Sequence, residues 1–368
     1  MRVADARSGI EGFADDLAQL GRYMAQRVPV YQRILERVGE TLDGDIGRRL
    51  AKSWSRRSFT AFYDRPLLLL ATLRFDALRE GTGHPLWAAI AGDPPDLDAA
   101  TAEAVAAALD RDRQRALVWH SLTRRSVQTN EVSRAVAWMW PAALFAGESR
   151  SIALCDLGAS AGLNLVADAP GVGLEWTANG ARLAVAGGEH VHLRRGFDRA
   201  PLDVMREEDA DWLRACIWPG ERERLDRLER AIAAFRAAAA GERPPRVETI
   251  EARDLPARLG ELAGAEPEPE FWLCYQTVVR EYLAASREAY LTGMRNWLAA
   301  MPRGRALWIE LETPQGGATR ERPAALIGHA RDAAGAVVDA VLARCEYHPI
   351  DLALEPDGIA LVHAALGG

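Results

Sequence analysis

The sequence lacks the features of a membrane or exported protein. No apolar run approaches the roughly 20 residues that a bilayer-spanning helix needs. The first 17 residues carry charges throughout and contain no apolar core of a signal peptide. The four cysteines lie far apart and form no C-x-x-C pair; Cys155 and Cys274 fall within apolar runs, where a reduced thiol behaves as a small hydrophobe. These absences predict a cytoplasmic protein without a membrane partner.

An excess of positive charge is also missing. The net charge is −7, which disfavours a nucleic-acid partner because phosphate binding requires a basic surface. Local arginine pairs occur at 124–125 and 194–195. With 368 residues, 49% of them hydrophobic and 26% charged, the chain has an ordinary globular composition and room for one large domain or two modest ones.

Strand signals are scarce in the first 147 residues. Apolar positions recur at helical spacing in 13–24, 59–78 and 103–120, and glycine- and proline-containing breaks separate them. Residues 128–145 predict a further helix that Pro141 kinks or ends. We therefore predict an all-helical subdomain over 1–147, serving as lid and substrate pocket, and a second domain over 148–368.

Strand and helix patterns alternate in this second part. Strands are predicted at 152–155, 247–252, 271–275 and 306–312, and helices at 207–240 (with a break at 215–220), 282–301 and 333–343. Turns at Asn179-Gly180 and Gly187-Gly188 predict a hairpin insertion around 172–195, and 350–363 predicts a terminal antiparallel hairpin. Such alternation favours an α/β fold with a mostly parallel sheet between helices.

The stretch from Ser151 to Ala167 is the most informative. A buried-type strand at 152–155 is followed by Asp156, a glycine-bearing turn at 157–162 and a helical pattern starting at Leu163. Small residues in such a turn allow a ligand to approach the backbone, and a helix start offers unpaired N–H groups. The pattern predicts a site for a polar or anionic ligand group.

The letters D-L-G-A-S-A-G at 156–162 resemble the acidic-x-Gly-x-Gly-x-Gly signature of class I S-adenosylmethionine (SAM)-dependent methyltransferases. Ser160 stands where the middle glycine usually lies, which makes the dinucleotide pattern G-x-G-x-x-G a poorer match. This resemblance implies SAM as cofactor and a Rossmann-like, mostly parallel seven-stranded sheet that ends in an antiparallel hairpin.

Four segments in order resemble bacterial domain-of-unknown-function family 2332. They are Q-T-N-E-V-S-R at 128–134, L-G-A-S-A-G-L-N at 157–164, R-G-F-D-R-A-P-L-D at 195–203 and I-W-P at 217–219, so the resemblance covers nearly the whole chain. It implies a methyltransferase-like fold without an established substrate. The family pattern makes Asn130, Glu131 and Arg134 candidates to close over SAM.

The methyltransferase resemblance implies a role for each residue that follows a strand. The methionine part of SAM would be lined by Asp156, Gly158, Ser160, Gly162 and Asn164. The ribose hydroxyls would bind Asp198, and adenine would contact Asp254 and Leu255. The transferred methyl group would face Tyr275 and Gln276. Asp198 follows Gly158 by 40 residues, about double the usual spacing of roughly 20. Glu175, at 17 residues, is therefore the alternative ribose ligand.

The predicted function is SAM-dependent methyl transfer to a small-molecule acceptor, on oxygen, nitrogen or carbon. The candidate bases are Glu131, Tyr275 and Glu310. Two alternatives stay open: a SAM-using lyase or cyclase that releases methylthioadenosine, and a non-catalytic interaction protein that retains the fold.

Several of these residues also have a purely structural interpretation. Asn130 and Glu131 suit a helix cap, and Glu310 and Glu312, which share one strand face, suit a solvated sheet edge. His190 and His192 alternate on a predicted strand without a third ligand nearby, so no metal site is expected.

Overall fold

The computed structural model describes residues 10–110, 117–147, 150–185, 188–266 and 268–368. Contacts divide the chain into two compact units, a helical unit of 1–129 with 206–226, and a sheet unit of 130–205 with 227–368. This division differs from the predicted boundary at residue 147. The segment 130–147 belongs with the sheet, and 206–226 returns to the helices.

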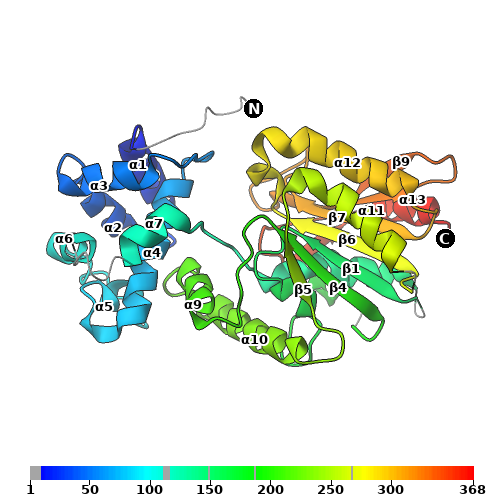
Figure 1. Cartoon of the computed structure of the whole chain (residues 1–368), viewed down its shortest axis with the longest axis horizontal. Helices are drawn as coiled ribbons and strands as arrows, with labels where there is room; N and C mark the ends of the chain where they lie inside the picture. Colours follow the sequence, from blue (N-terminus) through cyan, green and yellow to red (C-terminus); the bar gives the residue numbers. More distant parts are fainter. Residues whose placement is uncertain (1–9, 111–116, 148–149, 186–187, 267) are drawn as a thin grey trace. The chain divides into compact units, whose positions relative to one another are not determined.

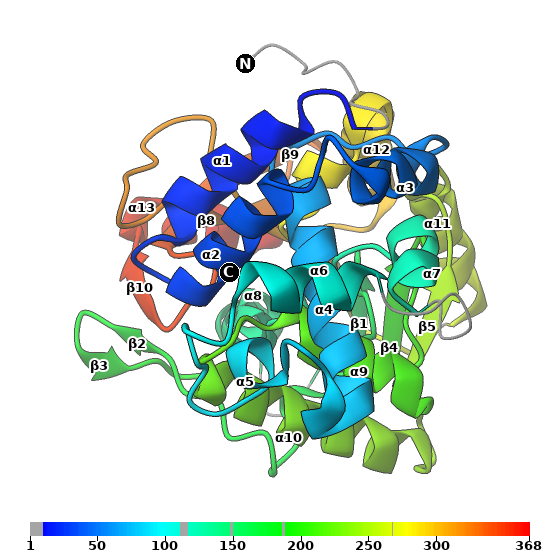
Figure 2. The ribbon, with the colours of Figure 1, turned by 90° about the vertical axis from the view of Figure 1, so that its left-hand side faces the viewer.

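The helical unit is built from eight α-helices in the part of the chain that is described: α1 (Phe13–Met24), α2 (Pro29–Gly39), α3 (Asp45–Trp54), α4 (Asp64–Glu80), α5 (Trp87–Ile90), α6 (Ala102–Asp110), α7 (Leu117–Arg124) and α9 (Glu207–Cys216). The helices expected at 13–24 and 59–78 are confirmed, the second beginning at Asp64. The one expected at 103–120 coincides with α6 and α7, and 111–116 lie outside the described residues. Figure 2 shows α4 at the centre of this unit.

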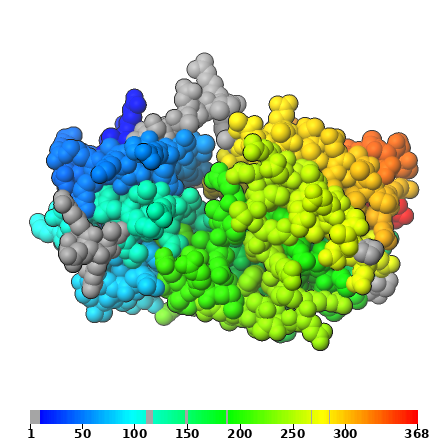
Figure 3. Space-filling model, viewed as in Figure 1, coloured from blue at the N-terminus to red at the C-terminus, as the bar shows by residue number. Residues whose placement is uncertain are grey.

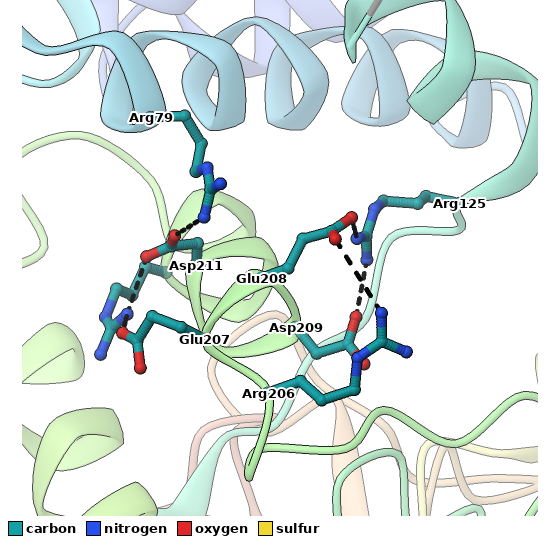
Figure 4. Close-up of polar contacts among 8 residues, drawn as sticks. Arg79, Arg125, Arg206, Glu207, Glu208, Asp209 and Asp211 are labelled. Atoms are coloured by element: carbon teal, nitrogen blue, oxygen red, sulfur yellow. Dashed lines mark hydrogen bonds and ion pairs between the residues drawn. The ribbon is translucent and has the colours of Figure 1, made fainter.

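Charged side chains join α9 to the other helices of its unit. Arg125, just beyond α7, binds Glu208 and Asp209, while Arg79 of α4 binds Asp211 at 3.0 Å (Figure 4). The Arg125 guanidinium also lies 5.2 Å from the centre of the Trp212 ring, which is fully buried. Partly buried arginine–carboxylate pairs of this kind explain why 207–216 is part of the helical unit.

One sheet forms the centre of the second unit. Among the described residues it has ten strands in the order β3-β2-β10-β9-β8-β7-β6-β1-β4-β5. Their bounds are β1 Ile152–Leu157, β2 Thr177–Ala178, β3 Ala181–Arg182, β4 Val191–Asp198, β5 Arg246–Thr249, β6 Phe271–Thr277, β7 Ala306–Glu312, β8 Ala324–Arg331, β9 Val337–Cys345 and β10 Asp351–Leu354. The five strands from β7 to β5 are parallel, as the alternating pattern predicts (Figure 1). The expectation of seven strands is wrong: β8, β9 and β10 extend the sheet in an antiparallel arrangement.

Two predictions near the C-terminus are wrong. Residues 333–343 form no helix; instead β9 pairs with β8, because β-branched valines at 337, 338 and 341 suit a strand once a partner strand is present. The predicted terminal hairpin is a strand followed by a helix, α13 (Pro356–Leu366). Pro356 lies in the first turn of α13, where a missing N–H costs nothing.

The segment between β1 and β4 differs in part from expectation. The stretch after the glycine turn is a four-residue 3₁₀ turn, Leu163–Val166, rather than an α-helix. The hairpin at Asn179-Gly180 is confirmed: both residues have positive φ, and β2 and β3 project beside β10 (Figure 2). The second predicted hairpin includes Gly187, which lies outside the described residues. The residues after it, from Val191 on, form β4, which pairs with β1 in parallel.

Helices cover the sheet. The helices α11 (Leu255–Ala265) and α12 (Arg287–Ala300) pack on what we call the α12 face, where Cys155, Cys274 and Trp308 lie in a buried core. Figure 1 shows these helices in front of the strands, and in Figure 3 their yellow-green and yellow atoms form much of the visible face of the sheet unit. Further helical elements of the sheet unit are a 3₁₀ turn at Val132–Ala135, α8 (Val136–Pro141), a π-helical turn at Ala142–Ala146 and, from residue 227 on, α10 (Arg222–Ala239). The kink expected at Pro141 coincides with the change from α- to π-helix.

Candidate functional site

A buried acid lies at the carboxyl end of the central strand. Asp156 of β1 is 2% exposed and is in register with Tyr275 of β6 and Gly196 of β4. Side chains alternate along a strand, so Asp156 and Tyr275 lie on the face opposite to Cys155 and Cys274. In open α/β sheets, ligands bind beyond the carboxyl ends of parallel strands, and Asp156 occupies such a position.

Several polar atoms around this end of the sheet are buried without a hydrogen-bond partner. They are Asn130 Oδ1, Asp156 Oδ2, Ser160 Oγ, Asn164 Oδ1 and Tyr275 Oη. Each belongs to a residue that the sequence predicts for the cofactor site. The Tyr275 hydroxyl is close enough to interact with the Asp156 carboxyl, but the two do not have hydrogen-bond geometry. Buried polar groups in folded proteins are normally paired, so this set of atoms needs a partner.

Burial and a neighbouring acid both disfavour the ionised form of Asp156. Burial is the main cause that raises the pKa of Asp156 to about 7; the Tyr275 hydroxyl opposes this shift, and the neighbouring Asp198 contributes to it. Burial and the Asp156 carboxyl together raise the pKa of Tyr275 well above its usual value. A cationic group placed beside Asp156 would favour the ionised carboxylate.

Asp198 and Asn130 hold the glycine turn. The Asp198 carboxylate accepts hydrogen bonds from the backbone N–H groups of Ser160 and Ala200, each at 2.8 Å. Ser160 has a φ of 53°, which is unusual for a residue with a side chain. The Asn130 side-chain amide donates to the carbonyl of Ala159 at 3.5 Å. The structure thus brings Asn130, Asp198 and the turn together.

The glycines of the turn have a packing role. Gly158 and Gly162 both have positive φ. A Cβ at Gly158 would lie 2.5 Å from Cγ2 of Val279, and one at Gly162 would lie 2.7 Å from Cγ2 of Val247. The absence of side chains therefore allows protein segments to pack closely on the turn.

Gln276 lies on the α12 face, away from Tyr275. Its side-chain amide donates to Glu312 Oε1 at 2.9 Å, and its side-chain carbonyl accepts from the hydroxyl of Tyr290. Strand alternation explains the separation, because adjacent residues of β6 point to opposite faces. The predicted pair Tyr275-Gln276 is therefore divided between two environments.

Glu310 also lies on the α12 face, and its carboxylate is fully paired. It binds the Arg280 guanidinium through two contacts, one of them 2.8 Å from Nε, and His329 Nε2 lies 2.8 Å from its Oε2. Burial opposes ionisation, but His329 and Arg280 outweigh it and lower the pKa of Glu310. The sequence analysis did not predict Arg280 and His329 as partners. The sequence did contain a feature that requires such partners: two acids in a buried strand, whose carboxylates need hydrogen-bond donors.

Glu312 completes this network. Its Oε1 accepts the backbone N–H of Val279 at 2.7 Å and that of Arg280 at 3.1 Å. Burial raises the pKa of Glu312 to about 7 in spite of these donors. The contacts hold the loop after β6, in which Val278 has a φ of 57° and Val279 packs on Gly158.

The other predicted ligand residues lie in exposed or apolar surroundings. Asp254 is 59% exposed and 3.6 Å from Arg253, whereas Leu255 is buried in the core under α11 and α12. Glu175 is 68% exposed and pairs with Arg182 of the β2–β3 hairpin. Its contacts therefore tie Glu175 to the hairpin, while Asp198 contacts the turn itself.

Glu131 joins three segments of the sheet unit. Its Oε1 accepts from the backbone N–H of Ser133 and from Arg227 Nε, both at 3.2 Å, and its Oε2 lies 3.3 Å from His348 Nδ1. Arg134 Nε donates to the carbonyl of Tyr347 at 2.9 Å. The predicted segment 130–134 thus contacts the glycine turn through Asn130 and the β9–β10 loop through Glu131 and Arg134.

Comparison with protein families identifies the chain. The family model described as an uncharacterized protein conserved in bacteria (DUF2332) matches residues 14–353. The chain belongs to this family. The predicted membership of DUF2332 is thereby confirmed. No curated protein and no solved structure matches the chain.

None of the described helices is both long and apolar enough to cross a bilayer. Within the same part of the chain, no group of three or more histidine, cysteine or acidic residues is arranged to hold a metal ion. His192 pairs with Glu268.

Proposed function

We propose that this DUF2332 protein is a SAM-dependent methyltransferase that acts on a small-molecule acceptor. The observation that carries the proposal is the set of unpartnered, buried polar atoms at Asn130, Asp156, Ser160, Asn164 and Tyr275, at the carboxyl ends of β1 and β6 and in the segments around them. A ligand with both donors and a positive charge would satisfy them.

The residues fit the polar parts of SAM. The Asp156 carboxyl suits an ammonium or sulfonium group, because burial penalises its ionised form and the neighbouring Asp198 adds negative charge. Asp198 accepts two backbone N–H groups and retains lone pairs for ribose hydroxyls. Because Val279 and Val247 pack on the glycines, the cofactor would contact the turn through the side chains of Ser160 and Asn164.

Bound SAM would supply the activated methyl group. The chain would contribute binding, orientation and exclusion of water. Asp198 holds the backbone of Ser160 in its left-handed conformation, and Asn130 contacts Ala159. Tyr275, fully buried beside Asp156, would line the position of the reacting group.

Calorimetric titration of the full chain with SAM and with S-adenosylhomocysteine tests the proposal. We expect micromolar binding of SAM by the wild type, and a loss of at least about tenfold in Asp156→Asn. Asp357→Asn, an exposed acid in the first turn of α13, is the control and should bind like the wild type. Absence of heat and of thermal stabilisation at millimolar SAM would refute the proposal.

Product analysis then separates the two enzymatic alternatives. Transfer to an acceptor leaves S-adenosylhomocysteine, whereas an intramolecular displacement releases methylthioadenosine. Mass spectrometry of the reaction mixture distinguishes the two nucleosides. Binding without either product would favour the non-catalytic alternative.

A further inference from the structure

A buried arginine in the helical unit lacks the partners that its charge requires. Arg74, in the middle of α4, is 6% exposed. Its Nη1 donates to the carbonyl of Ile90, the last residue of α5. Its Nε is buried without a hydrogen-bond partner, and no bond from Nη2 is found among the described residues. A guanidinium has five N–H donors, so most of those of Arg74 lack an acceptor in the part of the chain that the structure describes.

The hydroxyl and the thiol near Arg74 do not neutralise its charge. Burial lowers the pKa of Arg74, whereas Tyr31 of α2, Glu221 and Cys216 of α9 oppose this shift. Burial also raises the pKa of Tyr31, and it raises the pKa of Cys216 to about 12. Both groups are therefore uncharged at pH 7, and neither supplies a counter-ion.

The carboxylate that acts on Arg74 is bound to another arginine. Glu221 favours the charged form of Arg74, but within the described residues no carboxylate lies at ion-pair distance from this guanidinium. Oε2 of Glu221 accepts from Nη1 of Arg224 instead, and the Glu221 side chain is 29% exposed. A buried charge without a paired counter-ion is costly, and an anion beside Arg74 would remove this cost.

The free edge of the guanidinium determines which anion fits. Nη1 is bound to Ile90, so Nε and Nη2 remain. These two N–H groups form the side of a guanidinium that matches the two oxygens of a carboxylate. The negative charge of Glu221 nearby disfavours a dianion such as sulfate. The arrangement therefore favours a single carboxylate.

We propose that the helical unit holds a binding site for the carboxylate group of a small molecule, formed by Nε and Nη2 of Arg74. The groups that carry the argument all belong to this unit, which comprises 1–129 and 206–226. The proposal is therefore independent of the cofactor site in the sheet unit. It gives the helical unit a ligand of its own.

Nitrogen NMR of the arginine-labelled full chain tests this site directly. The Nε–H signal of Arg74 is identified by its absence in Arg74→Lys and by slow exchange with water, because the group is buried. Sodium acetate then replaces sodium chloride at constant ionic strength. We expect the Arg74 signal to shift saturably, with a dissociation constant on the order of 10 mM. The signal of Arg48, whose side chain is 72% exposed on α3, is the reference and should not saturate.

Thermal unfolding measures the same binding through stability, because a ligand of the folded chain raises Tm. In about 100 mM acetate, compared with chloride of equal ionic strength, the wild type should gain about 1–3 °C more than Arg74→Lys. Lysine keeps the charge but lacks the two parallel donors. Arg48→Lys is the matched control and should gain as much as the wild type.

Three outcomes decide the assignment. An Arg74 signal that acetate leaves in place, or that shifts in step with Arg48, would overturn the site and leave water as the partner of the unpaired donors. Tighter binding of sulfate than of acetate would overturn the carboxylate assignment. Saturable binding of acetate to the wild type, together with the smaller gain in Tm of Arg74→Lys, supports the proposal. None of these results depends on whether the chain binds SAM.

Discussion

Two polar clusters lie on opposite faces of the same sheet, and they differ in how well they are paired. On the α12 face, the side chains of Gln276, Glu310 and Glu312 are bonded to Arg280, His329, Tyr290 and backbone N–H groups. On the other face, Asp156 and Tyr275 and the residues near them retain atoms without partners. Both clusters use the ends of β6 and of a neighbouring parallel strand.

The difference separates structural from binding roles. A buried network whose carboxylates and amide are paired specifies and rigidifies the fold, although His329 Nδ1 has no hydrogen-bond partner among the described residues; here the network holds the loop after β6 against Gly158. A buried set with unsatisfied atoms costs free energy unless a ligand or water completes it. The first cluster should therefore control stability, and the second should control binding.

The largest expected loss of stability comes from disrupting the cluster on the α12 face. Arg280→Ala removes the guanidinium that binds the buried Glu310 and leaves an uncompensated carboxylate beside His329. We expect a loss of about 3–5 kcal/mol in the free energy of unfolding, measured by urea denaturation. Arg287→Ala, at an exposed position of α12, should change stability by less than about 0.5 kcal/mol. A loss of under 1 kcal/mol for Arg280→Ala would mean that the network is not structural.

The second effect concerns pH. Asp156 and Glu312 have pKa values of about 7 in the folded state, above those in the unfolded chain. As the pH rises, the unfolded chain therefore loses these protons at a lower pH than the folded protein does. Stability should fall by about 1.4 kcal/mol per pH unit for each group between about pH 4 and 7 and level off above pH 7. Asp156→Asn should remove its part of this slope without lowering stability at pH 7. If Asp156→Asn is several kcal/mol less stable than the wild type at pH 7, Asp156 stabilises the fold and does not serve mainly in binding.

A smaller effect is expected at the turn. Gly158→Ala introduces a Cβ at a φ of 85° and against Val279, so we expect a loss of about 1–3 kcal/mol, read from thermal unfolding. Gly171→Ala is the matched control, because Gly171 has open space at its Cβ position. Equal stability of the two variants would show that the loop after β6 does not pack tightly on the turn.

The smallest effect tests an expectation from the methyltransferase resemblance. Asp254 is exposed and close to Arg253, so we expect Asp254→Asn to change neither stability nor SAM affinity by more than about 0.5 kcal/mol. Calorimetry of this variant beside Asp156→Asn compares the two directly. A strong loss of SAM affinity in Asp254→Asn would contradict this expectation and support the contact with adenine that the resemblance implies.

Much of the architecture is predictable from local patterns. The buried strands β1, β6 and β7, the hairpin at Asn179-Gly180 and the amphipathic helix at 13–24 all follow from apolar periodicity and turn chemistry. The expected cofactor residues Asp156, Ser160, Asn164, Tyr275 and Asn130 share one property in the structure, a buried polar atom without a partner. Their proximity to one edge of the sheet is what the strand-end pattern predicts; the unpaired state of these atoms is a feature of the tertiary structure.

Other features depended on distant parts of the chain. Residues 337–345 form a strand because their backbone hydrogen-bonds to β8. This pairing outweighs the local helical pattern of the segment. Gln276 faces away from Tyr275, and Glu310 is paired rather than exposed, because the register of β6 and β7 sets which side chains share a face. His348 lies far from Glu131 in sequence, so no local pattern could join them.

By itself, the sequence determined the alternation of strands and helices, the tight turn after β1 and membership of DUF2332, because these depend on residue type over short ranges. The tertiary structure alone decided which polar residues are satisfied and which are not. Hydrogen-bond satisfaction depends on what packs against a residue from other segments, as Arg280 does on Glu310, and spacing along the chain carries no information about it.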